Sequence, residues 1–224
     1  MQLSSLGTGA LSSHTNRVLR NTYWLLALSL VPTIAGAWLG LSTGLLQGLG
    51  ALTSAILFLV GAFGLMFLVE KNKNSAAGIP LLLTFTFFMG LMLSRMLGFV
   101  LGTAGGTNVV MTAFAATTGV FFGMASLSTV IKRDLEPLGK ALFIGAMLLL
   151  VAMLANLFIG STALQLTLAM LAAGLFSLFV LVDLKRVRDG QETNYISATM
   201  GIFLSLYNVF SSLLQLVMAF GGED

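Results

Sequence analysis

Seven long apolar runs constrain this chain more than any other feature of its sequence. A helix needs about 20 residues, at about 1.5 Å per residue, to cross the hydrocarbon of a bilayer. Charged residues make up only 8% of the chain, against about 25% in soluble domains. We therefore predict an all-α integral membrane protein, a bundle of seven transmembrane helices. The runs lie near residues 23–45, 48–69, 79–102, 107–131, 140–159, 163–183 and 195–219.

Basic residues before the first run and in alternate connections predict the topology. Such residues stay on the cytoplasmic side of a membrane, so we expect a cytoplasmic N-terminus and a periplasmic C-terminus. The predicted parts are a cytoplasmic tail at 1–22, a membrane domain at 23–219 and a short outer tail at 220–224. The bases concerned are Arg17, Arg20, Lys71, Lys73, Lys132, Arg133, Lys140, Lys185, Arg186 and Arg188.

The composition argues against several classes of function. Bases scattered between apolar runs do not form the clustered face of a nucleic-acid binder. The single histidine, His14, lies in the predicted tail and cannot activate a serine inside the membrane. The chain has no cysteine and no cluster of acids and histidines at metal-ligand spacing. We therefore predict a non-enzymatic protein that needs no cofactor and no metal.

Glycines recur at the spacing that lets helices approach closely in lipid. The pairs and triplets lie four residues apart, which places their members on one helix face. We interpret them as packing seams of a tight bundle. The glycines concerned are Gly36, Gly40, Gly44, Gly98, Gly102, Gly119 and Gly123.

The last apolar run carries a polar stripe. Its residues are spaced 4, 3, 4 and 3 along the chain, so they share one helix face, which should point into the bundle. Two interpretations remain open, namely interhelical hydrogen bonding and the wall of a narrow path for protons or cations. The residues are Gly201, Ser205, Asn208, Ser212 and Gln215.

Two charged residues stand out against the apolar background. Asp183 ends the sixth run, where it could pair in water with Lys185 or Arg186, or lie against the last run as a proton or cation gate. Arg95 lies deep in the third run. We expect Arg95 to be a structural charge that snorkels to the outer interface, with Glu223 and Asp224 as candidate partners.

Three polar segments resemble a known family. They are "RVLRNTYWLLALSL" (17–30), "EKNKNSAAGI" (70–79) and "GQETNYISATMGIFLSLYNVFSSLL" (190–214). They are similar to the YccA-type bacterial branch of the transmembrane Bax inhibitor motif family. The resemblance implies a multi-pass inner-membrane protein whose last helix is central. It also implies a role in stress responses, either through binding and modulating the FtsH membrane protease or through a pH-sensitive leak of calcium or protons.

The chain departs from this family at two positions. Channel-like members pair two aspartates, of which the first matches Asp183 and the second matches Ser205, while Asn208 of the same motif is retained. One carboxylate facing a hydroxyl cannot titrate as a coupled carboxylate pair. A proline that the family carries in the third helix is replaced by Arg95. The missing second acid favours the FtsH modulator over the leak channel, which stays as the alternative, whereas the missing proline bears on the local shape of the third helix.

Overall fold

The chain folds into helices alone over the residues described. The computed structural model describes residues 3–221, with side chains from residue 15 onward. Each helix contains a segment long and apolar enough to cross a membrane, as the sequence predicted. The helices are α1 (Leu3–Thr43), α2 (Ala51–Asn72), α3 (Gly78–Leu101), α4 (Gly106–Val130), α5 (Glu136–Ile159), α6 (Thr162–Arg188) and α7 (Tyr195–Phe220).

The first helix differs most from the expected boundaries. It begins at Leu3 rather than near residue 23, so most of the segment predicted as a polar tail is helical. Thr15–Thr43 of α1 is long and apolar enough to span a membrane. Hydropathy measures how apolar a segment is and does not detect a polar helix that continues from an apolar one. Whether residues 1–22 lie in the cytoplasm stays a prediction.

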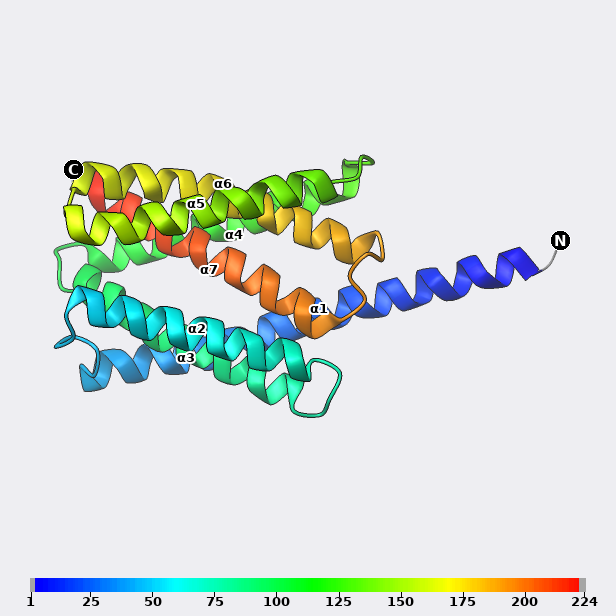
Figure 1. The fold of residues 1–224 in the computed structure, drawn as a ribbon, viewed down its shortest axis with the longest axis horizontal. Coiled ribbons are helices and arrows are strands. Elements are labelled where there is room, and N and C mark those ends of the chain that lie inside the picture. The colour runs from blue at the N-terminus through cyan, green and yellow to red at the C-terminus, as the bar shows by residue number, and fades with distance from the viewer. Residues whose placement is uncertain (1–2, 222–224) are drawn as a thin grey trace.

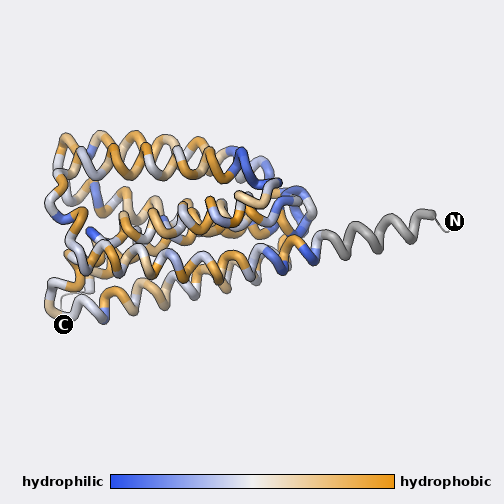
Figure 2. The backbone as a smooth tube through the Cα atoms, turned by 90° about the horizontal axis from the view of Figure 1, so that it is seen from below, coloured by the Kyte–Doolittle hydropathy of each residue, from blue (hydrophilic) through white to orange (hydrophobic). Residues whose placement is uncertain are grey.

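The helices run antiparallel and create two unlike ends (Figure 1). We call the end with connections 73–77, 131–135 and 189–194 the charged end, and the end with connections 44–50, 102–105 and 160–161 the uncharged end. Figure 2 shows apolar helix shafts with hydrophilic residues gathered at the charged end. The first part of α1 projects beyond that end (Figure 1). The charge alternation thus corresponds to two physical ends, and the assignment of the charged end to the cytoplasm stays a prediction.

Helix α7 forms the centre of the bundle. No residue from Tyr195 to Met218 is exposed, whereas every other helix has an exposed face. Helices α1, α2, α3, α4 and α6 all pack against α7, and α5 packs on α6 at the periphery. The resemblance implied a last helix wrapped by the other six; here five of them form its main contacts. Lipid therefore does not reach most of the polar stripe of α7.

The tightest helix pair, α1 and α3, meets at two glycines. A Cβ atom on Gly36 would collide with the backbone carbonyl oxygen of Phe87, and one on Gly90 would collide with that of Thr33. Each helix thus presents a glycine to the backbone of the other. In lipid this close approach supplies van der Waals contact, which replaces the hydrophobic drive available in water.

Other predicted glycine seams hold only in part. Gly40 faces the Ser94 side chain, as expected for the α1–α3 seam, but Gly44 instead ends α1 with a φ of +64°. The prediction is wrong for Gly119 and Gly123, because a Cβ atom on either would meet nothing within 4 Å. The spacing of glycines indicates which face of a helix lacks side chains. It does not specify whether another helix packs on that face.

We expect Gly90→Ala to destabilise the bundle, because the new methyl group would displace the Thr33 backbone. Overpacking of this kind typically costs about 1–3 kcal/mol. The measurement is the thermal unfolding midpoint of the full chain in detergent. Gly119→Ala is the matched control and should be neutral or slightly stabilising, since alanine favours a helix over glycine by about 1 kcal/mol. Equal midpoints for the two variants would contradict the seam.

Candidate functional site

Asp183 lies against the centre of the bundle rather than in open water. Its side chain is 18% exposed, and its Oδ2 accepts a hydrogen bond from the Ser205 hydroxyl of α7 at 3.4 Å. A Cβ atom on Gly201 would lie 3.3 Å from the same oxygen. Helix α6 can bring this carboxylate so close to α7 because Gly201 has no side chain. The structure thus brings together Asp183, Gly201 and Ser205, three residues singled out from the sequence.

The bases next to Asp183 in the sequence neutralise it only weakly. Arg186 Nη1 lies 4.0 Å from Asp183 Oδ1, at the limit of an ion pair. Lys185, which is buried, pairs instead with Asp189 Oδ2 at 2.6 Å. The arrangement is intermediate between the two sequence-based alternatives. Asp183 has a distant basic partner and a hydroxyl donor, and no second carboxylate of the described residues forms a hydrogen bond with it.

The rest of the polar stripe divides into separate hydrogen-bonded groups. The Asn208 amide donates to the Leu204 carbonyl of its own helix at 2.8 Å. Gln215 accepts a hydrogen bond from Gln165 of α6 at 3.1 Å, beside a cavity of about 370 Å³ between α5, α6 and α7. Ser212, which lies between Asn208 and Gln215 along the helix, is buried. The stripe therefore points inward, as predicted, and Asp183 and Gln165 contact it at two places.

A cluster at the charged end joins the segments that resembled a family. Asn194 caps α7, since its Oδ1 accepts hydrogen bonds from the amides of Ile196 at 2.9 Å and Ser197 at 3.2 Å. Its amide group donates to the Lys73 carbonyl at 3.2 Å and to Asn74 Oδ1 at 2.8 Å. The α6–α7 connection is thereby tied to the α2–α3 connection.

Glu70 and Thr22 extend this cluster to α2 and α1. Glu70 accepts a hydrogen bond from the Ser197 hydroxyl at 2.8 Å and another from the Lys73 ammonium. The hydrogen bond to Glu70 raises the pKa of Lys73. The Thr199 hydroxyl donates to the Tyr195 carbonyl of its own helix at 2.7 Å and also lies 3.4 Å from the Thr22 carbonyl oxygen of α1. Sequence analysis missed this cluster, although an Asn directly before an apolar run is a recognisable helix-start signal.

The α4–α5 connection is held at the same end by Asp134. The backbone N–H of Glu136 donates to its carboxylate at 3.0 Å, and Gln191 of the α6–α7 connection donates at 3.4 Å. These hydrogen bonds, the first above all, lower the pKa of Asp134. All three connections at the charged end are thus linked through side chains of the α6–α7 connection.

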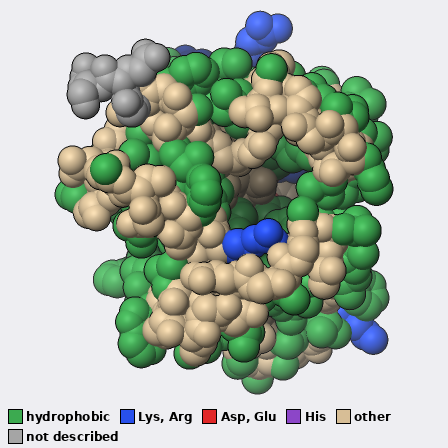
Figure 3. Space-filling model, turned by 90° about the vertical axis from the view of Figure 1, so that its left-hand side faces the viewer, with side chains coloured by type: hydrophobic (Ala, Val, Ile, Leu, Met, Phe, Trp, Pro, Cys, Tyr) green, Lys and Arg blue, Asp and Glu red, His purple; other side chains and the backbone are tan. Residues whose placement is uncertain are grey.

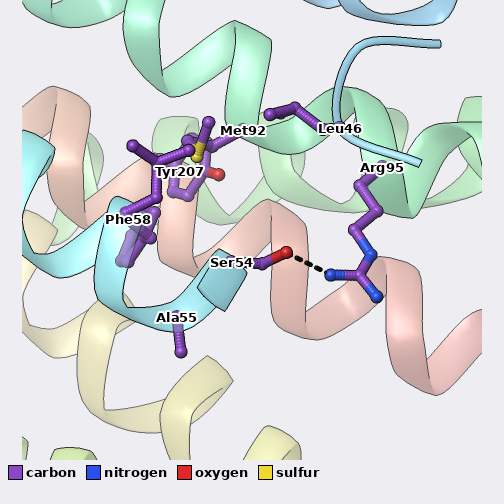
Figure 4. A pocket seen from close by; sticks show the side chains of 8 residues that line it. Leu46, Ser54, Ala55, Phe58, Met92, Arg95 and Tyr207 are labelled. Atoms are coloured by element: carbon purple, nitrogen blue, oxygen red, sulfur yellow. Dashed lines mark hydrogen bonds between the residues drawn. The ribbon is translucent and has the colours of Figure 1, made fainter. Parts of the chain in front are cut away.

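Arg95 lies far from these groups, near the uncharged end. Its guanidinium donates to the Ser54 hydroxyl of α2 (Figure 4). A cavity of about 230 Å³ opens beside it, with Tyr207 of α7 and Phe58 of α2 in its lining. Arg95 forms no ion pair with another residue of the described range. Its expected partners, Glu223 and Asp224, lie outside the described residues, so that expectation stays a prediction.

Within the described residues, no three acids, histidines or cysteines gather where they could hold a metal ion. The exclusion of a serine–histidine pair depended on the position of His14. The side chain of His14 lies outside the described residues, so that exclusion stays a prediction. The polar contacts of the cluster at the charged end are helix caps, an ion pair and hydrogen bonds between connections. This geometry gives the cluster a structural role.

We expect Asn194→Ala to lower the thermal midpoint, because loss of a helix cap typically costs about 0.5–2 kcal/mol and the bonds to the α2–α3 connection are lost as well. Asn194→Asp should lose less, because it keeps the capping oxygen and removes only the donor. Thr193→Ala, at an exposed neighbouring position, is the control. Amide hydrogen exchange at Ile196 and Ser197 should accelerate in Asn194→Ala alone, and unchanged exchange would count against the cap.

Comparison with known proteins places this arrangement in a family. The family model described as "Inhibitor of apoptosis-promoting Bax1" matches residues 15–222. "Modulator of FtsH protease YccA" of Escherichia coli is 37% identical over 217 residues, covering 97% of this chain and 95% of that protein. An uncharacterized protein of Neisseria meningitidis is 38% identical over 219 residues, covering 95% of this chain and 96% of the relative.

A second Escherichia coli relative, with the same 37% identity over 217 residues and the same coverage of 97% and 95%, is named "Inner membrane protein YccA". The family is one of membrane proteins and not a known enzyme family. The matches span the seven helices, including the three polar segments that meet at the charged end. The chain therefore belongs to the Bax inhibitor family.

Proposed function

We propose that this protein is an inner-membrane regulator that binds and modulates an FtsH-type membrane protease. The observation that carries the proposal is the full-length similarity to the Escherichia coli protein named "Modulator of FtsH protease YccA". A binding function also agrees with a site built from hydrogen-bonded structural groups.

The shape of α1 suggests where such a partner would act. The first part of this helix projects past the charged end (Figure 1), which the positive-inside rule assigns to the cytoplasm. A cytoplasmic ATPase would meet the projecting segment before any other part of the chain. Val18, by contrast, is buried against Val187 and Ala198 and belongs to the bundle. The boundary between a segment open to binding and the bundle thus falls before Val18.

Deletion of residues 2–14 should therefore remove modulation of the protease and leave the bundle folded. The measurement is the degradation rate of an FtsH substrate in membranes containing the full chain or the deletion variant. Replacing the same residues by a Gly/Ser segment of equal length is the control for length. If the deletion variant modulates degradation as the full chain does, the role assigned to this segment is wrong.

A second candidate function is a cation or proton leak at Asp183. It is favoured by one contact, the approach of this carboxylate to Ser205 and Gly201 at the centre of the bundle. An acid within a transmembrane helix commonly marks an ion pathway. It ranks second because Ser205 stands where a second acid would form a proton-sharing pair, so the coupled titration of such a pair is missing.

We expect Ser205→Asp to introduce a pH-dependent calcium flux, because two carboxylates at this distance share a proton and titrate together. Flux is measured in liposomes at several pH values, because a proton shared between two carboxylates makes their charge depend on pH. Ser205→Asn, which adds a polar side chain of similar size without an acid, is the control. The unmodified chain should resemble empty vesicles; a flux that Asp183→Asn removes would instead establish the leak and overturn the ranking.

A further inference from the structure

The pocket beside Arg95 combines one charged group with apolar walls. Arg95 and Met92 come from α3, Ser54 and Phe58 from α2, and Tyr207 from α7 (Figure 4). Its volume of about 230 Å³ would hold several water molecules at about 30 Å³ each, or one compact anionic group. Seen from the uncharged end, the surface is hollowed and a basic side chain lies at the edge of the hollow (Figure 3).

The guanidinium lies close to the depth at which a helix leaves the hydrocarbon. Ser54, which accepts its hydrogen bond, is in the first turn of α2, three residues after Ala51. That separation corresponds to about 4.5 Å along the helix axis. Arg95 itself lies six residues before the end of α3 at Leu101, or about 9 Å, and its long side chain reaches toward that end. A helix of 22 residues is about 33 Å long and crosses a hydrocarbon core of about 30 Å with its ends at the two surfaces, so we infer that the guanidinium lies near the level of the lipid headgroups.

No acid of the described bundle can neutralise Arg95. The nearest acid along α2 is Glu70, which lies 16 residues beyond Ser54, or about 24 Å at helical rise. The other described acids also lie near the charged end, and they are Asp134, Glu136, Asp183, Asp189 and Glu192. A charge held within a transmembrane segment is costly, so a counter-ion from the surroundings would stabilise it.

The surroundings of the pocket favour a lipid as the source of that counter-ion. Helix α2 exposes most of its surface, and Leu57 of the pocket wall is itself 39% exposed. Phe58 and Met92 offer apolar contact next to the guanidinium. A guanidinium binds phosphate oxygens through two parallel hydrogen bonds, and Ser54 supplies a further hydroxyl. The combination matches a phosphodiester attached to an apolar chain better than it matches a free ion.

We propose that this pocket binds the phosphate of a glycerophospholipid in the leaflet at the uncharged end, with Arg95 and Ser54 contacting the phosphate. The glycerol and the first acyl carbons would lie against Phe58 and Met92. This site is independent of the proposed protease modulation. Arg95 would both connect α3 to α2 through Ser54 and bind the lipid phosphate.

The test is lipid binding by the full chain in detergent. Short-chain phosphatidylglycerol and inorganic phosphate are titrated separately, and bound molecules are counted by native mass spectrometry. Arg95→Gln should weaken phosphatidylglycerol binding at least about tenfold, as expected for a charge-assisted hydrogen bond. Arg20→Gln removes the same charge at the charged end and should bind as the unmodified chain does. Inorganic phosphate should not occupy the site at the concentrations at which the lipid does.

Several outcomes would overturn the proposal. Equal lipid binding by Arg95→Gln and the unmodified chain would exclude the pocket, and equal losses in Arg20→Gln would show a non-specific charge effect. Displacement of the lipid by inorganic phosphate would identify a free-anion site. If removal of residues 222–224 strengthens lipid binding only while Arg95 is present, the chain's own carboxylates occupy the pocket.

Folding is controlled in the same experiment. The thermal midpoints of the variants without lipid separate lost binding from lost structure. Arg95→Lys keeps the charge and loses the two-pronged geometry, so it should bind more weakly than the unmodified chain and more tightly than Arg95→Gln. Ser54→Ala should cause a smaller loss than Arg95→Gln. A folded Arg95→Lys variant that binds no better than Arg95→Gln would contradict a charge-based site.

Discussion

A bilayer offers no hydrogen bond to a polar group in its hydrocarbon core, and the rest of this structure depends on that constraint. The backbone satisfies itself within helices, and many hydroxyls do the same. Thr22, Ser29 and Ser177 each donate to the carbonyl four residues earlier in their own helix, at 2.9, 2.8 and 2.6 Å. Helix association is then left to close backbone approach and to a few hydrogen bonds that cross between helices.

Those crossing bonds are distributed unevenly along the bundle. Asn194, Glu70 and Asp134 join all three connections at the charged end. Toward the uncharged end the crossing side-chain bonds include those of Gln165 with Gln215 and of Arg95 with Ser54, and each lies beside a cavity. One end is therefore tied together by its own side chains, while the other leaves space for water, lipid or ions.

The two candidate sites share α7 but not the same side of it. Ser205 faces Asp183 on α6, and Tyr207, two residues later, lines the Arg95 pocket toward α2 and α3. Residues two apart on a helix point in different directions. The carboxylate and the guanidinium thus lie on different sides of α7 and also toward opposite ends of the bundle, which explains how unlike charges coexist within one small bundle without pairing.

Hydropathy and periodicity predicted the helices and the inward polar stripe, because lipid restricts a long apolar segment to one structure and a polar face to one direction. They also singled out Asp183 and Arg95, since charges are rare in such segments. They could not show that Gly90 meets Thr33 while Gly119 meets nothing, or that Asn194 bonds to Asn74 across 120 residues. Those contacts depend on which helix lies beside which. Many arrangements of seven helices would expose apolar side chains to lipid equally well, so hydropathy does not select one. The sequence by itself determined that the protein lies in lipid, where its helices run and which side chains they carry. Only the tertiary structure decided which side chains contact each other, because such a contact requires two helix surfaces to fit together.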